Sequence, residues 1–273
     1  MVSEFLTDLK ARLHLLMPGP YRLARRFLTK SGRESAWLND LTQQFIARHG
    51  LVISGGPFKG MVIEKNIADE IHQTAAKLIG SYESELHGFL ETIIHTEYSK
   101  IINIGSADGY YAIGLALQKK GVPVYAFEMD PLPAKLCRMQ IAANHVADQV
   151  SLLGACDLEQ LSSLNLDRAL IVCDCEGCEV HLLRPDVLPG LKSCDILVEL
   201  HDVLDPSISP TLLPRFAGTH NISIVSSTDR DPSVYRALDF LSEQNRVSLI
   251  AESGRAGVME WAYMTPKLPK AGN

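Results

Sequence analysis

The sequence of 273 residues has no apolar run near the roughly 20 residues that a membrane-spanning helix needs. Its N-terminal segment also lacks the unbroken apolar stretch of a secretory signal, because charged residues interrupt it at Glu4, Asp8, Lys10 and Arg12. We therefore expect a cytoplasmic protein with no membrane span.

Positive charge is also scarce. Lysine and arginine number 26 against 32 aspartates and glutamates, which gives a net charge of −6. This balance disfavours a nucleic-acid partner held mainly through its phosphates. A local basic group at Arg22, Arg25, Arg26 and Lys30 is interpreted as a solvated helix face. Hydrophobic residues make up 46% of the chain, so a globular core of ordinary size is expected.

The six cysteines show no spacing typical of a disulfide framework: 137, 156, 173, 175, 178 and 194. Several fall inside apolar segments, where a reduced cysteine acts as a small hydrophobe. The run Cys173-x-Cys175-x-x-Cys178 suggests a metal-thiolate site, but no nearby pair completes four ligands. We expect reduced thiols and assign no metal ligand.

The first 95 residues have the pattern of a mainly helical appendage. Apolar residues at helical spacing, with proline and glycine at the ends, predict helices at 5–16, 35–49 and 83–95. Two short strands, at 51–53 and 61–63, flank a glycine turn. We expect this segment to pack on a second domain, residues 96–273.

Strands and helices alternate from Lys100 onward. Strands are predicted at 101–104, 123–128, 150–153, 169–173 and 196–200, helices at 110–119 and 134–145, and closing strands at 222–225 and 258–264. Alternation of this kind is typical of a parallel, doubly wound sheet covered by helices on both faces. The predicted fold is an α/β, Rossmann-like, doubly wound sheet of seven strands.

Ligands of such sheets bind beyond the carboxyl ends of the strands. The first strand is followed by a loop with two glycines, which let the backbone turn sharply and approach a ligand closely. The loop and the start of the next helix consist of Gly105, Ser106, Ala107, Asp108, Gly109 and Tyr110. We predict that these residues bind a nucleoside-type cofactor.

Other strand ends support the same site. Glu128 ends the second strand about 20 residues further on, where a carboxylate can accept both hydroxyls of a ribose. Ala155 lies among small residues after the third strand, which leave room for an adenine. Asp174 ends the fourth strand and is placed to meet the amino-acid end of a cofactor, or a substrate.

The loop favours S-adenosyl-L-methionine over a dinucleotide. A dinucleotide fingerprint needs G-x-G-x-x-G, whereas this loop has Ala107 in place of the second glycine and a negative charge at Asp108. S-adenosylmethionine has no phosphate, and its sulfonium and ammonium are cations. A nicotinamide oxidoreductase and a non-catalytic binding module remain the alternatives.

Two segments resemble known methyltransferases. Residues 103–111 (N-I-G-S-A-D-G-Y-Y) resemble the first motif of class I methyltransferases. Asp174, Glu176 and Glu179 lie in D-x-E-G-x-E spacing that resembles the FkbM-like methyltransferases, and residues 197–202 also fit that group. The resemblance spans about residues 80–202. It implies S-adenosylmethionine as methyl donor and a sugar or small-metabolite hydroxyl as acceptor.

The catalytic residues that we predict are His201, Asp174 and Glu176. A hydroxyl must lose a proton as it attacks a methyl group, and a histidine of near-neutral pKa is suited to accept it. A divalent metal held by Asp174, Glu199 or Asp202 is an alternative route to the same deprotonation, and a polar strand end without catalytic role is another. No N-P-P-Y-like segment follows Asp174, which favours an oxygen over a flat amine as the methyl acceptor.

The remaining expectations concern neighbouring segments. Gly56–Gly60 is interpreted as a ribbon on the substrate side or as a contact between two copies in a homodimer. Tyr82, Glu83 and Glu85 either begin a helix or cover the methionine end of the cofactor. Glu179 either begins a helix that runs to about Leu188 or joins the site.

Overall fold

The computed structural model describes residues 32–70, 73–252 and 257–267. The helix predicted at 5–16 and the basic group at Arg22, Arg25, Arg26 and Lys30 lie outside these residues. Within the described part of the chain, no helix is both long enough and apolar enough to span a membrane.

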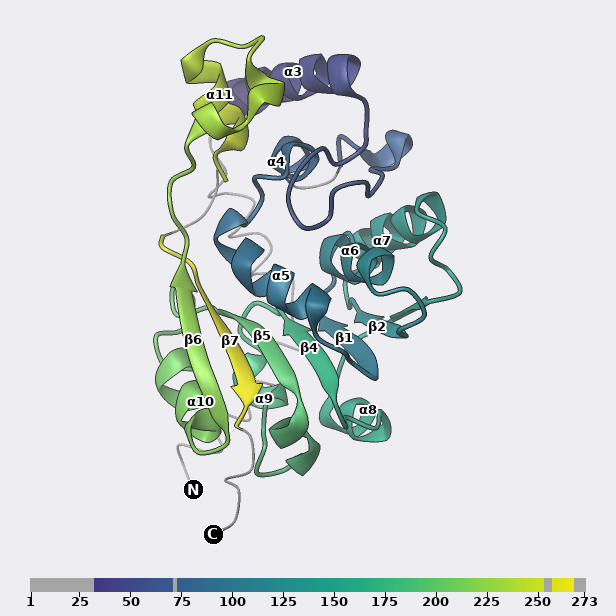
Figure 1. Ribbon diagram of the computed structural model, residues 1–273, viewed down its shortest axis with the longest axis vertical. Coiled ribbons are helices and arrows are strands. Elements are labelled where there is room, and N and C mark those ends of the chain that lie inside the picture. The colour runs from purple at the N-terminus through teal and green to yellow at the C-terminus, as the bar shows by residue number, and fades with distance from the viewer. Residues whose placement is uncertain (1–31, 71–72, 253–256, 268–273) are drawn as a thin grey trace.

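One sheet of seven strands forms the centre of the molecule (Figure 1). Its strands are β1 (Lys100–Ile104), β2 (Val124–Phe127), β3 (Val150–Leu153), β4 (Ala169–Cys173), β5 (Asp195–Leu200), β6 (His220–Ser226) and β7 (Glu260–Pro266). The order across the sheet is β3-β2-β1-β4-β5-β7-β6. The predicted Rossmann-like fold of seven strands is therefore confirmed.

The alternation of strands and helices predicts a parallel sheet, but the sheet is only partly parallel. Strands β1 to β5 pair in parallel, whereas β7 runs antiparallel to both of its neighbours, β5 and β6. The chain order reverses between β1 and β4, which are hydrogen-bonded neighbours. Their carboxyl ends therefore meet where such sheets bind ligands.

Helices cover both faces of the sheet. On one face lie α5 (His87–His95), α6 (Tyr110–Gln118) and α7 (Pro131–Ala143), and on the other α8 (Leu158–Ser163), α9 (Glu179–Leu182) and α10 (Ile208–Ala217) (Figure 1). Successive residues of a strand point to opposite faces. Accordingly Leu170 and Val172 belong to the core beneath α5 to α7, and Ile171 and Cys173 to the core beneath α8 to α10.

The N-terminal segment packs against a C-terminal one. Helices α3 (Gly32–His49) and α4 (Thr74–Ile79) contact α11 (Glu243–Ile250), at the top of Figure 1. Buried residues of this segment, Phe45 and Leu78 among them, belong to the same hydrophobic core as one face of the sheet. The predicted boundary at residue 95 thus falls within one continuous core.

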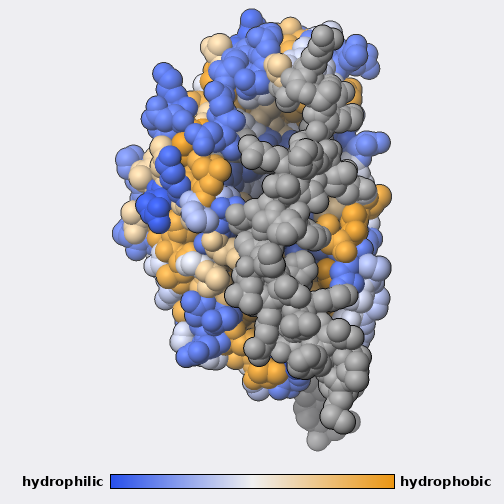
Figure 2. All heavy atoms as spheres, turned by 180° about the vertical axis from the view of Figure 1, so that it is seen from behind, coloured by the Kyte–Doolittle hydropathy of each residue, from blue (hydrophilic) through white to orange (hydrophobic). Residues whose placement is uncertain are grey.

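Several predicted elements differ in extent. The ribbon reduces to a single antiparallel bridge between Val52 and Val62, and the helix predicted at 83–95 begins as a 3-10 turn, Ser84–Leu86, before α5. The helix expected to run to Leu188 ends at Leu182, because Pro185 cannot continue it. The surface carries hydrophobic residues in groups between hydrophilic ones on the face seen in Figure 2.

Candidate functional site

The loop after β1 is pressed against the end of β4. Gly105 has a φ of 77°, and a Cβ placed on it would lie 1.7 Å from the carbonyl oxygen of Asp174. The amides of Gly105 and Ser106 both donate to the carbonyl of Phe127 at 2.9 Å. Only glycine fits this close approach. The loop, β2 and β4 are thereby locked together at the reversal point.

The Glu128 carboxylate fixes the same loop from the other side. Its Oε2 accepts a hydrogen bond from the Ala107 amide at 2.9 Å, and its Oε1 accepts one from the Asp130 amide at 2.6 Å. Glu128 is only half-buried. Because a carboxylate offers about four lone-pair sites, both oxygens keep acceptor capacity for ligand hydroxyls.

The predicted cofactor residues divide into two groups by exposure. Those at least partly open to solvent are Gly105, Ala107, Glu128, Ala155 and Asp174. Those buried beneath the loop surface are Ser106, Asp108, Gly109 and Tyr110. The first group has access to a bound molecule, whereas the second holds the shape of the loop.

Asp108 is paired inside the protein. Its Oδ2 lies 2.6 Å from Nζ of Lys77, and the two side chains are 9% and 5% exposed. The ammonium also lies 5.1 and 5.3 Å from the ring centroids of Tyr82 and Tyr110. The charge of Asp108 is therefore neutralised by Lys77 of α4, so this carboxylate alone would not exclude a phosphate from the loop. The loop still differs from a dinucleotide fingerprint in its glycine spacing and in having Ala107 in place of the second glycine.

Glu83 and Glu85 join the N-terminal segment to the C-terminal one. The hydroxyl of Tyr111 donates to the Glu83 carboxylate, and the Glu83 amide donates to Glu252 at 2.7 Å. Glu85 forms an ion pair of 2.5 Å with Arg230, which also pairs with Glu252. Neither the glutamates nor this arginine partner was recognisable as an anchor from the sequence.

Tyr82 lies near the carboxylates of the site. Burial, then the charge of Glu83 and the charges of Asp174 and Glu199, raise the pKa of its hydroxyl well above the ordinary value. The phenol therefore stays protonated and can donate a hydrogen bond at the edge of the site. The helix that the sequence allowed to begin here starts only at the 3-10 turn Ser84–Leu86.

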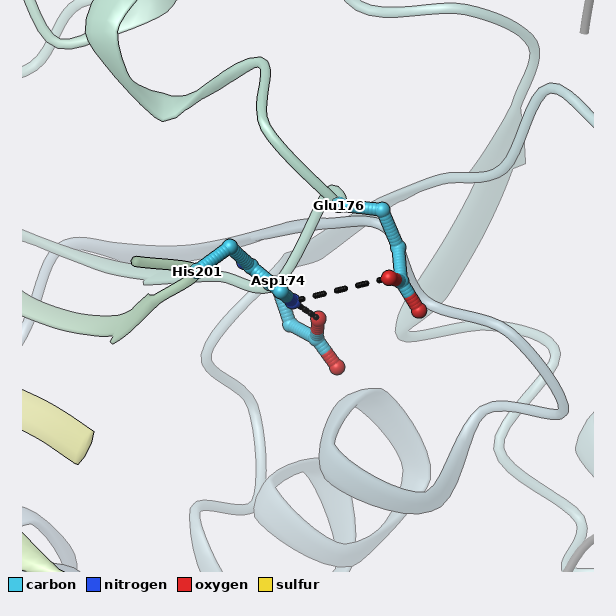
Figure 3. A group of neighbouring side chains, drawn as sticks. All are labelled: Asp174, Glu176 and His201. Carbon is cyan, nitrogen blue, oxygen red and sulfur yellow. Dashed lines mark ion pairs between the residues drawn. The ribbon is translucent and has the colours of Figure 1, made fainter. Parts of the chain in front are cut away.

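A histidine lies among carboxylates where β4 and β5 end (Figure 3). His201 follows β5 and is 2% exposed. Its Nδ1 donates to Oε1 of Glu179 at 2.7 Å, and Glu179 is fully buried. The same oxygen accepts from the amides of Cys175 and Gly177 at 3.3 Å. Glu179 therefore orients the imidazole, a role that D-x-E-G-x-E spacing alone did not indicate.

The other ring nitrogen faces three carboxylates. His201 Nε2 lies 3.3 Å from Oε2 of Glu199, 3.4 Å from Oδ1 of Asp174 and 3.8 Å from Oε2 of Glu176. In Figure 3 the side chains of Asp174 and Glu176 approach this nitrogen from the loop after β4. The structure thus brings together the three predicted catalytic residues and adds Glu199.

These carboxylates change the protonation of the site. Burial by itself lowers the pKa of His201, but the hydrogen bonds to Glu179 and Glu199 and the charge of Asp174 outweigh it and raise the pKa to about 12. Burial and the neighbouring Glu199 raise the pKa of Asp174 well above its usual range. The imidazole is therefore protonated at neutral pH, so Nε2 has no free lone pair with which to act as a base.

A disulfide closes the loop that carries Glu176. Cys175 and Cys178 are bonded, and Sγ of the buried Cys173 lies 3.7 Å from that of Cys175. Within the loop Glu176 has a φ of 57° and Gly177 a φ of 106°. The expectation of reduced thiols is wrong for this pair, because their Cα atoms lie only 5.5 Å apart across a turn.

Asp202 is engaged away from the cluster. Its carboxylate accepts from the Ser209 amide at 2.9 Å and from the Ser209 hydroxyl, at the start of α10. Of the metal ligands considered from the sequence, Asp174 and Glu199 face His201, whereas Asp202 serves the helix.

Comparison with known proteins gives distant likenesses. No family model matches the chain. The release factor glutamine methyltransferase of Dictyoglomus turgidum is 27% identical over 121 residues, which are 43% of this chain and 43% of that protein. The chain thus matches less than half the length of this relative.

Several solved structures are also similar to this chain, at low sequence identity. The precorrin-6y C5,15-methyltransferase of Geobacter metallireducens has a TM-score of 0.43 and 12% identity, covering 67% of this chain and 85% of its own. A human methyltransferase 10 domain containing protein has a TM-score of 0.41 and 13% identity, covering 65% and 79%. The precorrin 8w decarboxylase of Methanobacterium thermoautotrophicum has a TM-score of 0.43 and 18% identity, covering 66% and 88%. Likeness at this level identifies no activity.

Proposed function

We propose that the chain is an S-adenosylmethionine-dependent methyltransferase, FkbM-like in its motifs, that methylates a hydroxyl oxygen of a sugar or another small metabolite. The observation that carries this proposal is the hydrogen bond between Glu128 and the Ala107 amide. It places a half-buried carboxylate beside the glycine loop at the point where strand order reverses. A nucleoside ribose binds at such a place.

The chemistry of the donor groups fits this cofactor. When bound, S-adenosylmethionine supplies a methyl group on a positively charged sulfur. Glu128 accepts hydrogen bonds from ribose hydroxyls, and Asp174, 29% exposed, offers a carboxylate to the ammonium. The neighbouring Glu199 and Glu176 add negative charge where the cationic part of the cofactor would lie.

One of two carboxylates is the proton acceptor in this proposal. His201 is protonated at neutral pH, so its predicted role as base passes to Asp174 or Glu176. The raised pKa of Asp174 makes it a stronger base than an ordinary carboxylate. Holding the acceptor oxygen about 3 Å from the methyl supplies much of the remaining rate.

A hydroxyl oxygen fits the loop better as methyl acceptor than a flat amine does. The relative from Dictyoglomus turgidum is a release factor glutamine methyltransferase by name. Here Asp174 is followed by Cys-Glu-Gly-Cys rather than by an N-P-P-Y-like segment, which in amino-methylating enzymes would hold a flat amine. An acidic loop suits a group that must lose a proton before it attacks.

Calorimetry with four ligands tests the cofactor. S-adenosylmethionine and S-adenosylhomocysteine are expected to bind in the micromolar range, while NAD and NADP are expected not to bind at the same concentrations. Tighter binding of NAD than of the adenosyl ligands would support an oxidoreductase instead. A screen of sugars and small metabolites with methyl-labelled donor then separates an enzyme from a binding module, which would take up the donor and transfer nothing.

A further inference from the structure

We propose that the carboxylates around His201 form a divalent-metal site. Its ligands are Asp174, Glu176 and His201 Nε2, and Glu199 lies beside them, 3.3 Å from Nε2. Glu179 is the positioning residue that holds the imidazole. These residues come from the carboxyl ends of β4 and β5, which are paired neighbours, and β4 also pairs with β1, the strand that the glycine loop follows.

The first argument is the orientation of the imidazole. The Nδ1–H donates to the Glu179 carboxylate at 2.7 Å, which directs Nε2 toward the three other carboxylates. Metal-binding histidines almost always donate their second ring nitrogen to a carboxylate or carbonyl in this way, which fixes the ring and makes the ligand more basic. Glu179 is fully buried, and the same oxygen also accepts from the amides of Cys175 and Gly177, which hold the carboxylate in place.

The second argument is the spacing of the donor atoms. The oxygens of Asp174, Glu199 and Glu176 lie 3.3 to 3.8 Å from Nε2. Charge-assisted hydrogen bonds are shorter, about 2.7–2.9 Å. Octahedral ligands at about 2.1 Å from a metal are separated by about 3.0 Å in cis and about 4.2 Å in trans. The donor atoms of Asp174, Glu176 and His201 all lie within 4.8 Å of one another, so small shifts bring them into one coordination sphere.

The third argument is charge. Four carboxylates contact a single imidazole, so the group is negative even when the imidazole is protonated. Glu179 also has an oxygen, Oε2, that is buried and makes no hydrogen bond within the described residues. Buried negative charge is costly unless a cation compensates it. A divalent ion would take the place of the proton on Nε2 and neutralise more of the charge.

The site is open on one side, as catalysis would require. The side chains of Asp174 and Glu176 are 29% and 42% exposed, while those of His201 and Glu199 are 2% and 9% exposed. An ion held there keeps coordination positions for oxygens of the acceptor. Its effect on reactivity, lowering the pKa of a bound hydroxyl, rests on the proposed function, whereas the site itself does not.

The donor set indicates a hard ion. Carboxylates favour Mg²⁺ and Mn²⁺, and one imidazole is compatible with Mn²⁺. Mn²⁺ is therefore the probe, because its free form gives an electron paramagnetic resonance signal that disappears on binding. The full chain is titrated with MnCl₂, with and without S-adenosylhomocysteine.

We expect one tight Mn²⁺ site in the wild type, with affinity at least about tenfold weaker in Glu176→Gln and in Asp174→Asn, because even the loss of a supporting group weakens metal sites about 10–100-fold. Glu176 is exposed, so its variant is expected to fold. Asp202→Asn is the matched control, because Asp202 is next to His201 after β5 but its carboxylate accepts from Ser209, and this variant is expected to bind Mn²⁺ as the wild type does.

The proposal is overturned if the wild type binds no Mn²⁺ below millimolar concentration, or if Glu176→Gln and Asp174→Asn bind it as tightly as Asp202→Asn does. Binding of S-adenosylhomocysteine is measured in the same samples. If S-adenosylhomocysteine binds and Mn²⁺ does not, the metal site is contradicted and the proposed methyltransferase function stands. If Mn²⁺ binds and S-adenosylhomocysteine does not, the methyltransferase function is contradicted and the metal site stands.

Discussion

The Glu128 carboxylate accepts a backbone hydrogen bond on each of its oxygens. A glutamine can accept only one of them, and its amide group would face a backbone donor. In Glu128→Gln we expect affinity for S-adenosylhomocysteine to fall by more than tenfold, because each charge-assisted hydrogen bond contributes about 1.5–3 kcal/mol. Isothermal titration calorimetry measures the change.

Asp130→Asn provides the control for this variant. Asp130 is the next acid along the chain and caps α7 through the Leu132 amide. Asparagine preserves that cap, so both the fold and the affinity for the ligand should stay close to the wild type. Equal affinities of the two variants for S-adenosylhomocysteine would show that Glu128 does not contact the cofactor.

Lys77 and Asp108 offer a second test at the scale of residues. Both side chains are buried, so Lys77→Met leaves a carboxylate without its cation beneath the loop. We expect the free energy of unfolding to fall by about 3–5 kcal/mol, the cost of breaking a buried pair. Urea denaturation followed by circular dichroism gives the value.

The double variant Lys77→Met with Asp108→Asn distinguishes this explanation from lost packing. Removing both charges should recover a large part of the stability, because the unpaired carboxylate is gone. If the double variant is as unstable as the sum of the single ones, the pair contributes little and Lys77 matters only as packing.

Residues next to recognisable strands were the ones that sequence could identify. Glu128, Asp174 and His201 were assigned because each follows an apolar run, and the sheet brings such ends together. Lys77 and Arg230 were not, since their partners lie 31 and 145 positions away. The signal available for Lys77 was a lysine within the short helix Thr74–Ile79, whose other residues are apolar except for Thr74.

At the scale of elements, the loop after β4 is held by a covalent bond. The Cys175–Cys178 disulfide encloses Glu176 and Gly177, both at positive φ. Reduction is expected to lower the free energy of unfolding by about 2 kcal/mol, which the chain-entropy relation gives for so short a loop. Thermal unfolding with and without dithiothreitol measures it.

Counting the free cysteines by alkylation tests whether the disulfide is present in solution. Alkylation in denaturant should add four groups to the untreated protein, on Cys137, Cys156, Cys173 and Cys194, and six after reduction. The variant Cys175→Ser with Cys178→Ser should show no effect of dithiothreitol on its melting temperature. Six alkylated cysteines before reduction would mean that the bond is absent in solution.

Strands were predicted better than helices because their signal is simpler. Buried strands such as Ala169–Cys173 are continuous apolar runs, and their ends are visible in the sequence. The short helices α4 and α8 have six residues each, too few for a clear helical period. The antiparallel direction of β7 is decided by pairing with strands far along the chain, which local sequence does not encode.

At the scale of the whole molecule, the N-terminal segment and the sheet share one hydrophobic core. We therefore expect a single cooperative unfolding transition. The two tryptophans report on both parts, since Trp37 lies in α3 and Trp261 is buried in β7. In Trp37→Phe and in Trp261→Phe, the fluorescence of the remaining tryptophan should follow the far-ultraviolet circular dichroism of the same variant.

Comparison within each variant removes the effect of the substitution on overall stability. A melting temperature for Trp37 well below that of the circular dichroism would show that α3 unfolds separately. That result would favour the predicted division at residue 95 over one cooperative unit.

The place of β7 in the sheet has a consequence for the order of synthesis. β7 lies between β5 and β6 although it follows both along the chain. Until residue 266 has left the ribosome, β5 exposes an unpaired, apolar edge and β6 has no neighbour on the sheet. Exposed edges of this kind recruit other chains. The nascent protein thus passes through a stage open to aggregation, which the arrival of one late strand closes.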